Sequence, residues 1–184
     1  MNSNPANKVT EEQKNALFVL SKVAYDAAVA QRGEMAAGKP GLASSLSQQP
    51  HPQSLCGCGC QEYVCGYYCF STQGCGCSSY LYISSNLTTI GPTQNQGMPA
   101  HFNGSANGPM NASINLSDVY MSGVFPDVNS VVNHTLPFNL EISSGAVTMT
   151  FYDQGRVLGV MHSLPGHYYN GYFHGSGTGT FTLA

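Results

Sequence analysis

Short runs of alternating apolar and polar residues fill the chain from Tyr63 to its end. In "AVTMTFYD" (146–153), Val147, Met149 and Phe151 share one face of an extended strand, and Thr148 and Thr150 share the other. The similar runs are "EYVCGYYCF", "SSYLYISSNLTTI", "MPAHFN", "NASINLS", "VYMSGVF", "HTLPFNLEI", "RVLGVMHSL", "GHYYNGYFHG" and "GTFTLA". Turn signals such as "SSG" and "LPG" separate several of them, and no helical pattern intervenes. About eight to ten short strands of this kind predict a mainly β domain, either an antiparallel barrel or a sandwich.

Glycines mark a hairpin and a strand bend in this domain. Asp153, Gln154 and Gly155 form a short connection between two strand runs, with glycine where a positive φ is favoured. Gly159 follows in the returning strand, where a missing side chain allows bending or close approach. Asp153, Gly155 and Gly159 are therefore predicted to define the fold at this turn.

One helix is predicted before the strands, over residues 10–37. Thr10 and Gln13 have the spacing of a capping box, and Gly33, Gly38 and Pro40 supply a stop. The apolar residues that repeat at helical spacing are Ala16, Leu17, Leu20, Ala24, Ala27 and Ala28. We expect this face to dock on the domain or to bundle with other copies of the chain, so self-association through residues 10–37 is a candidate contact. Binding at a membrane surface is disfavoured because the polar face is poor in Lys and Arg.

Composition divides the chain into segments. Nine of the fifteen charged residues lie in the first forty positions. The predicted segments are a helical segment (1–37), a linker rich in Pro, Ser and Gln (38–55), a cysteine-rich segment leading into the barrel (56–77) and the β-barrel itself (78–184).

The charge distribution excludes some partners. The net charge is −3, and Arg156 is the one Lys or Arg after Lys39, so no basic stripe is available for nucleic acid. The longest apolar run, "ALFVL", is too short to span a bilayer. Glu11 and Glu12 stand where a secretory signal has positive charge, so export is expected to use another route or a leader outside this sequence.

All seven cysteines lie within the cysteine-rich segment. They are Cys56, Cys58, Cys60, Cys65, Cys69, Cys75 and Cys77. Disulfides are the favoured interpretation, as local staples in an oxidising environment, and the odd count leaves one thiol free or paired with a second molecule. Two alternatives stay open: a soft-metal cluster, although no C-x-x-C pair is present, and reduced cysteines used as small strand residues.

Aromatic and histidine side chains gather near the end of the chain. The candidate binding residues are His167, Tyr168, Tyr169, Tyr172 and His174. Exposed tyrosine rings beside Asn170 would suit a lectin-like glycan site, although barrel tyrosines also cover core edges. His167 and His174 are seven residues apart, so a regular strand would put them on opposite faces. Neither a catalytic carboxylate pair nor a nucleophile motif is recognisable, so the sequence predicts no enzyme, no metal site and no cofactor.

Three motifs resemble the Vap family, the small secreted virulence-associated proteins of intracellular actinobacterial pathogens. They are "INLSDVYMSGVFPDVNSVVNHTLPFNL", "MTFYDQGRVLGVMH" and "GSGTGTF", which together span residues 114–183. The resemblance implies a compact antiparallel barrel of about eight strands in Greek-key order, without enzymatic activity, that acts on a host factor or host membrane. This chain departs from the family in its charged N-terminal helix and in its seven cysteines.

Three functions are carried forward from the sequence. The first is a host-directed effector or toxin that acts through binding, in an extracellular or cell-surface location. The second is a structural or surface protein that assembles through the helix and the cysteine-rich segment. The third is a lectin-like glycan binder.

Overall fold

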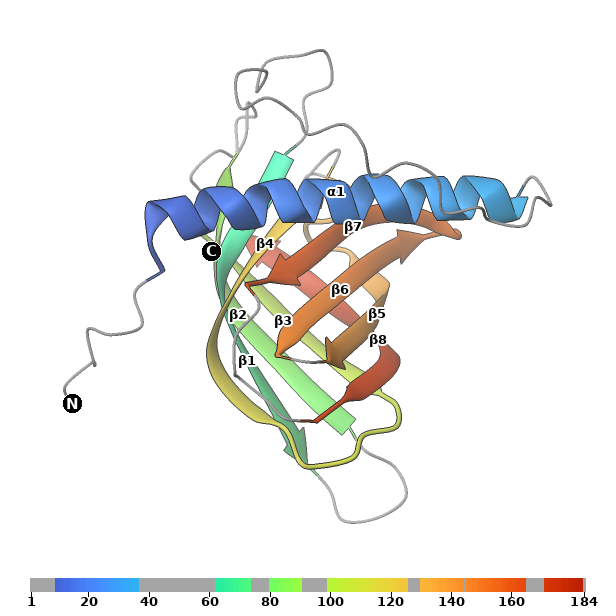
Figure 1. The fold of residues 1–184 in the computed structure, drawn as a ribbon. Coiled ribbons are helices and arrows are strands. Elements are labelled where there is room, and N and C mark those ends of the chain that lie inside the picture. The colour runs from blue at the N-terminus through green and yellow to red at the C-terminus, as the bar shows by residue number, and fades with distance from the viewer. Residues whose placement is uncertain are drawn as a thin grey trace.

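One helix and eight strands make up the fold. The computed structural model describes residues 9–36, 62–73, 80–90, 99–125, 130–143, 145–164 and 171–183. The helix is α1 (Glu11–Ala36), and the strands are β1 (Glu62–Gln73), β2 (Tyr80–Ile90), β3 (Pro99–Asn107), β4 (Asn115–Phe125), β5 (Thr135–Ser143), β6 (Ala146–Asp153), β7 (Arg156–Ser163) and β8 (Phe173–Leu183). Figure 1 shows α1 lying across the wall of a barrel that these strands form.

The strands close into an antiparallel barrel in the order β1-β2-β3-β8-β5-β6-β7-β4. β1, β2 and β3 follow one another, and β4 returns to lie beside β1. In the same way β8 returns to lie beside β5, after β5, β6 and β7. Each set of four is a Greek key, and the β3–β8 and β4–β7 pairings join the two sets into one wall. The predicted fold class, an eight-stranded Greek-key barrel preceded by one helix, is confirmed.

The strand bounds differ from the sequence expectation at two places. Ten runs become eight strands because "NASINLS" and "VYMSGVF" merge into β4, and because β8 joins the described end of "GHYYNGYFHG", from Phe173, to "GTFTLA". Asp118, with a φ of 59°, interrupts the alternation of β4 at a bulge opposite β1 without ending the strand. The barrel also begins at Glu62, within the cysteine-rich segment, and not at Ser78.

Aromatic rings fill the interior of the barrel. Phe102 is fully buried, and its ring centroid lies 4.7 Å from that of Phe181 and 5.7 Å from that of Phe151. The ring centroid of Phe125 lies 5.7 Å from those of both Phe151 and Phe181. The described interior is therefore a packed core, as in other small barrels whose side chains fill the lumen.

A glycine makes room for one of these rings. A Cβ placed on Gly159 would overlap the ring of Phe125, which is itself fully buried. At this position of β7 the missing side chain allows a ring to approach the strand. The adjoining hairpin turns at Gln154 and Gly155, with φ values of 45° and 82°, as a two-residue turn between the paired Asp153 and Arg156 requires.

The helix begins at the predicted capping box. The backbone N–H of Gln13 donates to Thr10 Oγ1 (3.2 Å), and that of Thr10 donates to Gln13 Oε1 (2.9 Å). Gly33 does not stop the helix, which continues to Ala36, because one glycine costs only about 1 kcal/mol in a helix interior. No helix in the described part of the chain has the length and apolar character needed to cross a membrane.

The helix packs on β4 and β7 through a narrower face than its apolar residues predict. Leu17 and Ser21 are fully buried, and the hydroxyl of Ser21 donates to the carbonyl oxygens of Ser122 (2.7 Å) and Leu17 (2.9 Å). Leu20, by contrast, is 44% exposed, and Ala16 and Ala27 are exposed as well. The helix therefore docks on its own domain, as one of the two expected arrangements, but only part of the predicted apolar face is covered.

Candidate functional site

Outward side chains of three neighbouring strands form a continuous surface that is uncharged except for Glu141 at one end. Because alternate residues of a strand point to opposite sides, the residues that flank the buried positions of β3, β8 and β5 share the outside of the barrel. We call this surface the hydroxyl–amide face; it consists of His101, Asn103, Ser105, Asn107, Thr135, Pro137, Asn139, Ser176, Thr178, Thr180 and Thr182.

The pairing register aligns these residues in rows across the strands. Thr180 lies between Asn103 of β3 and Thr135 of β5. Ser176 lies in the same way between Asn107 and Asn139. A hydroxyl or a side-chain amide can donate and can accept hydrogen bonds. The rows therefore present donors and acceptors side by side to a ligand.

Hydrogen bonds within and beside the hydroxyl–amide face hold some of its side chains. The hydroxyls of Thr135 and Thr180 are 3.0 Å apart, and Asn139 Nδ2 donates to the hydroxyl of Tyr152 (3.3 Å). The guanidinium of Arg32 lies over the Tyr152 ring, with 4.8 Å from Cζ to the ring centroid. The C-terminal part of α1 is thereby linked to the edge of this face.

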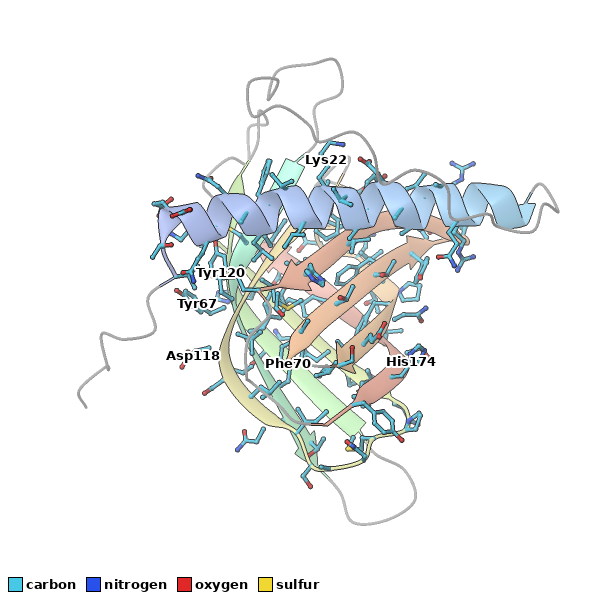
Figure 2. All side chains as sticks on the ribbon, in the orientation of Figure 1. Lys22, Tyr67, Phe70, Asp118, Tyr120 and His174 are labelled. Atoms are coloured by element: carbon cyan, nitrogen blue, oxygen red, sulfur yellow. The ribbon has the colours of Figure 1, made fainter. Side chains whose placement is uncertain are left out.

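Two of the five predicted binding residues lie in described segments, at the end of the face where β8 begins. Tyr172 is 47% exposed, and its backbone N–H donates to Asn111 Oδ1 (2.8 Å). His174 is exposed and stands opposite Glu141 of β5. Figure 2 shows His174 on a different side of the barrel from Tyr67 and Tyr120. His167, Tyr168 and Tyr169 lie outside the described residues.

A second cluster lies on the outer surface of β1 and β4, beside the N-terminal part of α1. The rings of Tyr67 and Tyr120 meet edge to face, with centroids 5.2 Å apart, and Tyr120 is hydrogen-bonded to Cys65. Burial raises the pKa of the Cys65 thiol, and burial followed by the bond to Cys65 raises that of the Tyr120 hydroxyl. Both groups therefore stay protonated at neutral pH, which is the opposite of an activated nucleophile.

Two of the seven predicted disulfide cysteines can be placed. Cys65 and Cys69 are free thiols on β1, and both project from the outer side of that strand. Four residues of extended strand separate their Cα atoms by about 13 Å, whereas a disulfide needs them within about 7 Å. This distance excludes a disulfide between Cys65 and Cys69 themselves, and a bond from either of them to another cysteine stays a prediction. Cys56, Cys58, Cys60, Cys75 and Cys77 lie outside the described residues, so their pairing stays a prediction.

His162 does not come together with His174. It lies on β7, half-buried, with Nδ1 2.7 Å from Thr148 Oγ1 of β6. β5 and β6 stand between β7 and β8 in the barrel wall, so the two histidines are about three strand spacings, or ~14 Å, apart. In the described segments, no group of three or more His, Cys, Asp or Glu side chains is arranged to hold a metal ion.

Stability is expected to fall as the pH is lowered past the ordinary pKa of histidine. Burial lowers the pKa of His162, so the unfolded chain takes up a proton near pH 6.5 while the folded chain still resists it. The free energy of unfolding should thus keep its full value above about pH 6.5. It should decline below that pH until His162 is protonated in the folded protein as well. Urea unfolding from about pH 7.5 to about pH 5.5 checks this, with His162→Gln as the matched variant. An equal decline in both proteins would contradict the assignment to His162.

The hydroxyl–amide face is absent from the candidates that the sequence suggests. Its available signal was the alternation of Ser and Thr with Gly in "GSGTGT" (175–180), which places hydroxyls on one side of a strand. This alternation does not indicate which strands lie beside β8 in the sheet. Only the barrel order brings the outward Asn and Ser of β3 and the outward Thr and Asn of β5 beside it.

Comparison with known proteins gives one structural likeness. No protein-family model and no curated protein sequence matches the chain. Among solved structures, the chain is similar to the virulence-associated protein VapB from the intracellular pathogen Rhodococcus equi. The match has a TM-score of 0.41 and 15% sequence identity, and it covers 66% of this chain and 96% of that one. At this identity no residue role is carried from one chain to the other.

Proposed function

We propose that this protein acts by binding, without catalysis, and that its ligand is an uncharged polyhydroxylated molecule such as a glycan. The observation that carries the proposal is the hydroxyl–amide face, a continuous outer surface of three paired strands whose side chains are hydroxyl, amide, imidazole and proline groups. A sugar offers the same alternation of donors and acceptors, so each ligand hydroxyl can exchange its hydrogen bonds with water for bonds to this face.

The packed interior supports an external site. Phe102, Phe138, Phe151 and Phe181 have exposed fractions of 1% or less, so side chains occupy the space in which wider barrels hold a ligand. Tyr172 adds an exposed ring at one end of the hydroxyl–amide face, where it can cover the apolar side of a sugar.

A glycan of a host cell surface would be consistent with the host-directed role that the sequence suggests. The hydroxyl–amide face is open and strand-based rather than concave, and such a surface buries less of a ligand than a deep pocket. We therefore expect weak binding by each face, which gains strength when several faces engage one surface.

A glycan array probed with the full labelled chain, followed by calorimetry with the best glycan, tests the proposal. Two matched double variants are used: Asn103→Ala with Ser105→Ala on β3, and Asn115→Ala with Ser117→Ala on β4. Each pair removes an exposed or half-exposed Asn and Ser two residues apart, and only the first pair lies in the hydroxyl–amide face. Two lost hydrogen bonds of about 1 kcal/mol each should weaken binding about tenfold or more in the first variant alone.

Two outcomes would overturn the proposal. One is an array without a glycan signal, and the other is equal loss of binding in both double variants. Neutral and anionic lipid vesicles, tested in parallel at neutral and acidic pH, examine the membrane alternative. Binding to vesicles without binding to glycans would replace the proposed ligand with a lipid surface.

A further inference from the structure

Helix α1 presents an apolar stripe on the side that faces away from the barrel. Val19, Leu20 and Val23 are 46%, 44% and 41% exposed, although they are large apolar residues in the middle of a docked helix. Water-exposed apolar groups that lie together in this way mark interaction surfaces more often than scattered ones do. Leu17 and Ser21, which contact the barrel, lie on a different side of the helix from Val19 and Val23, and Leu20 lies at the boundary between the two sides.

The stripe follows the spacing of a coiled-coil seam. Ala16, Leu20, Val23, Ala27 and Ala30 are separated by four, three, four and three residues, and all five are exposed. This spacing keeps side chains on one line along a helix and lets them interlock with a facing helix. Between Ala16 and Ala30 the seam is about 21 Å long. We call these five residues, together with Val19, the outer seam.

We infer that the outer seam pairs with the outer seam of a second copy of this chain, with the two helices antiparallel. The reason lies in the distribution of large and small residues. The N-terminal half of the outer seam holds Val19 and Leu20 after the small Ala16, the C-terminal half holds only Ala27 and Ala30, and Val23 lies at the centre. An antiparallel copy puts Leu20 of each helix against the small Ala27 of the other, so that large and small side chains interdigitate there. Ala16 then lies against Ala30, where two small residues let the helices approach closely.

Charges beside the outer seam fit a second copy better than an anionic surface. Lys22 lies on the side of α1 away from the barrel (Figure 2), and its ammonium is 2.8 Å from the carboxylate of Asp26, so the two charges neutralise each other. No row of Lys and Arg flanks the outer seam in the described helix, as binding to anionic lipid would require. Antiparallel helices also bring the positive N-terminal end of one dipole beside the negative C-terminal end of the other.

The pairing leaves the hydroxyl–amide face open. α1 covers β4 and β7, whereas this face belongs to β3, β8 and β5. A two-fold axis through the Val23 pair would put one barrel on each side of the helix pair and present two faces. The seam is short, so we expect a weak dimer with a dissociation constant of about micromolar order. The gain in avidity from two faces rests on the proposed function, but the pairing itself does not.

Sedimentation of the full chain tests the pairing, in reducing buffer so that cysteines do not cross-link the copies. Between about 1 µM and about 200 µM the mass should rise from 19.5 kDa towards twice that value. Val23→Glu should remain a monomer, because two carboxylates would meet at the axis. Val29→Glu is the matched control, since Val29 is 43% exposed on the same helix but lies outside the outer seam. It should dimerise like the unmodified chain.

Mixed variants test the orientation. Ala16→Glu and Ala30→Lys should each weaken the dimer, and mixing the two should restore it, because antiparallel helices put position 16 beside position 30. If a mixture of Ala16→Glu and Ala16→Lys restores the dimer instead, the antiparallel arrangement is wrong.

Two results would overturn the pairing itself. One is a chain that stays monomeric at every concentration, and the other is an equal effect of Val23→Glu and Val29→Glu. Vesicle binding by the monomer that is lost in Val23→Glu would also overturn the pairing, because the outer seam would then be a lipid-binding surface. Glycan binding by a monomeric chain would leave the proposed function standing.

Discussion

Replacing Phe102 with alanine is expected to lower the free energy of unfolding by about 3–5 kcal/mol. The ring lies at the centre of the barrel, with no exposed surface. Its centroid is 4.7 Å from Phe181, 5.7 Å from Phe151, 5.8 Å from Phe138 and 6.2 Å from Tyr68. Removing it takes away contacts to four rings from four other strands, and the surrounding wall cannot collapse into the space without breaking strand pairs.

The loss is large against a total stability of about 5–15 kcal/mol for an ordinary domain. Urea unfolding followed by tyrosine fluorescence measures it, and Tyr172→Ala is the control. Tyr172 is an aromatic residue with 47% of its surface exposed, so its removal should change the free energy of unfolding by no more than about 0.5 kcal/mol. Similar small losses in the two variants would mean that Phe102 is not at the centre of a packed interior.

Replacing Gly177 with alanine should destabilise the barrel by about 3 kcal/mol or more, at the upper end of the cost of overpacking. A Cβ at this position of β8 would overlap the carbonyl oxygen of Ser105 and would lie 2.7 Å from Cα of Ala106. These are backbone atoms of the paired strand β3, so relief requires the two strands to separate. The β3–β8 pairing is one of the two joints between the Greek keys, and the damage should therefore reach the whole wall.

Gly155→Ala provides the comparison for that prediction. Gly155 has a φ of 82°, and nothing lies within 4 Å of an added Cβ. Its replacement costs only the conformational strain of a left-handed alanine, about 1–2 kcal/mol. Thermal unfolding of the two variants should show a clearly larger fall in melting temperature for Gly177→Ala. The reverse order would show that β3 and β8 are not packed as closely as described.

Local patterns predicted those parts of the fold that depend on neighbours along the chain. Val147, Met149 and Phe151 point into the core as their alternation indicates, and each is 1% exposed or less. Thr10 and Gln13 form the hydrogen bonds that their spacing predicts. In both cases the period of the backbone alone decides which way a side chain points.

The remaining features depend on contacts between segments that are distant in sequence. The apolar residues of α1 could not be divided between its two sides until β4 and β7 were placed beneath it, which buries Leu17 and leaves Leu20 exposed. The hydroxyl–amide face likewise requires β8 to lie between β3 and β5, and the alternation within a strand does not encode that order. The sequence predicts that Gly159 allows a bend or a close approach, because glycine has no side chain. That the approaching group is the ring of Phe125 follows only from the closed barrel.

The closed wall is tested most directly by nuclear Overhauser effects between β4 and β7 in the isotope-labelled chain. These strands close the barrel through the pairs Met121–Ser163, Ser122–His162, Gly123–Met161 and Val124–Val160. We predict cross-strand effects between the backbone protons of these pairs, together with slow amide exchange in both strands. Absence of these effects, with fast exchange along β4 and β7, would contradict a closed barrel and would reopen its interior as a site for ligands.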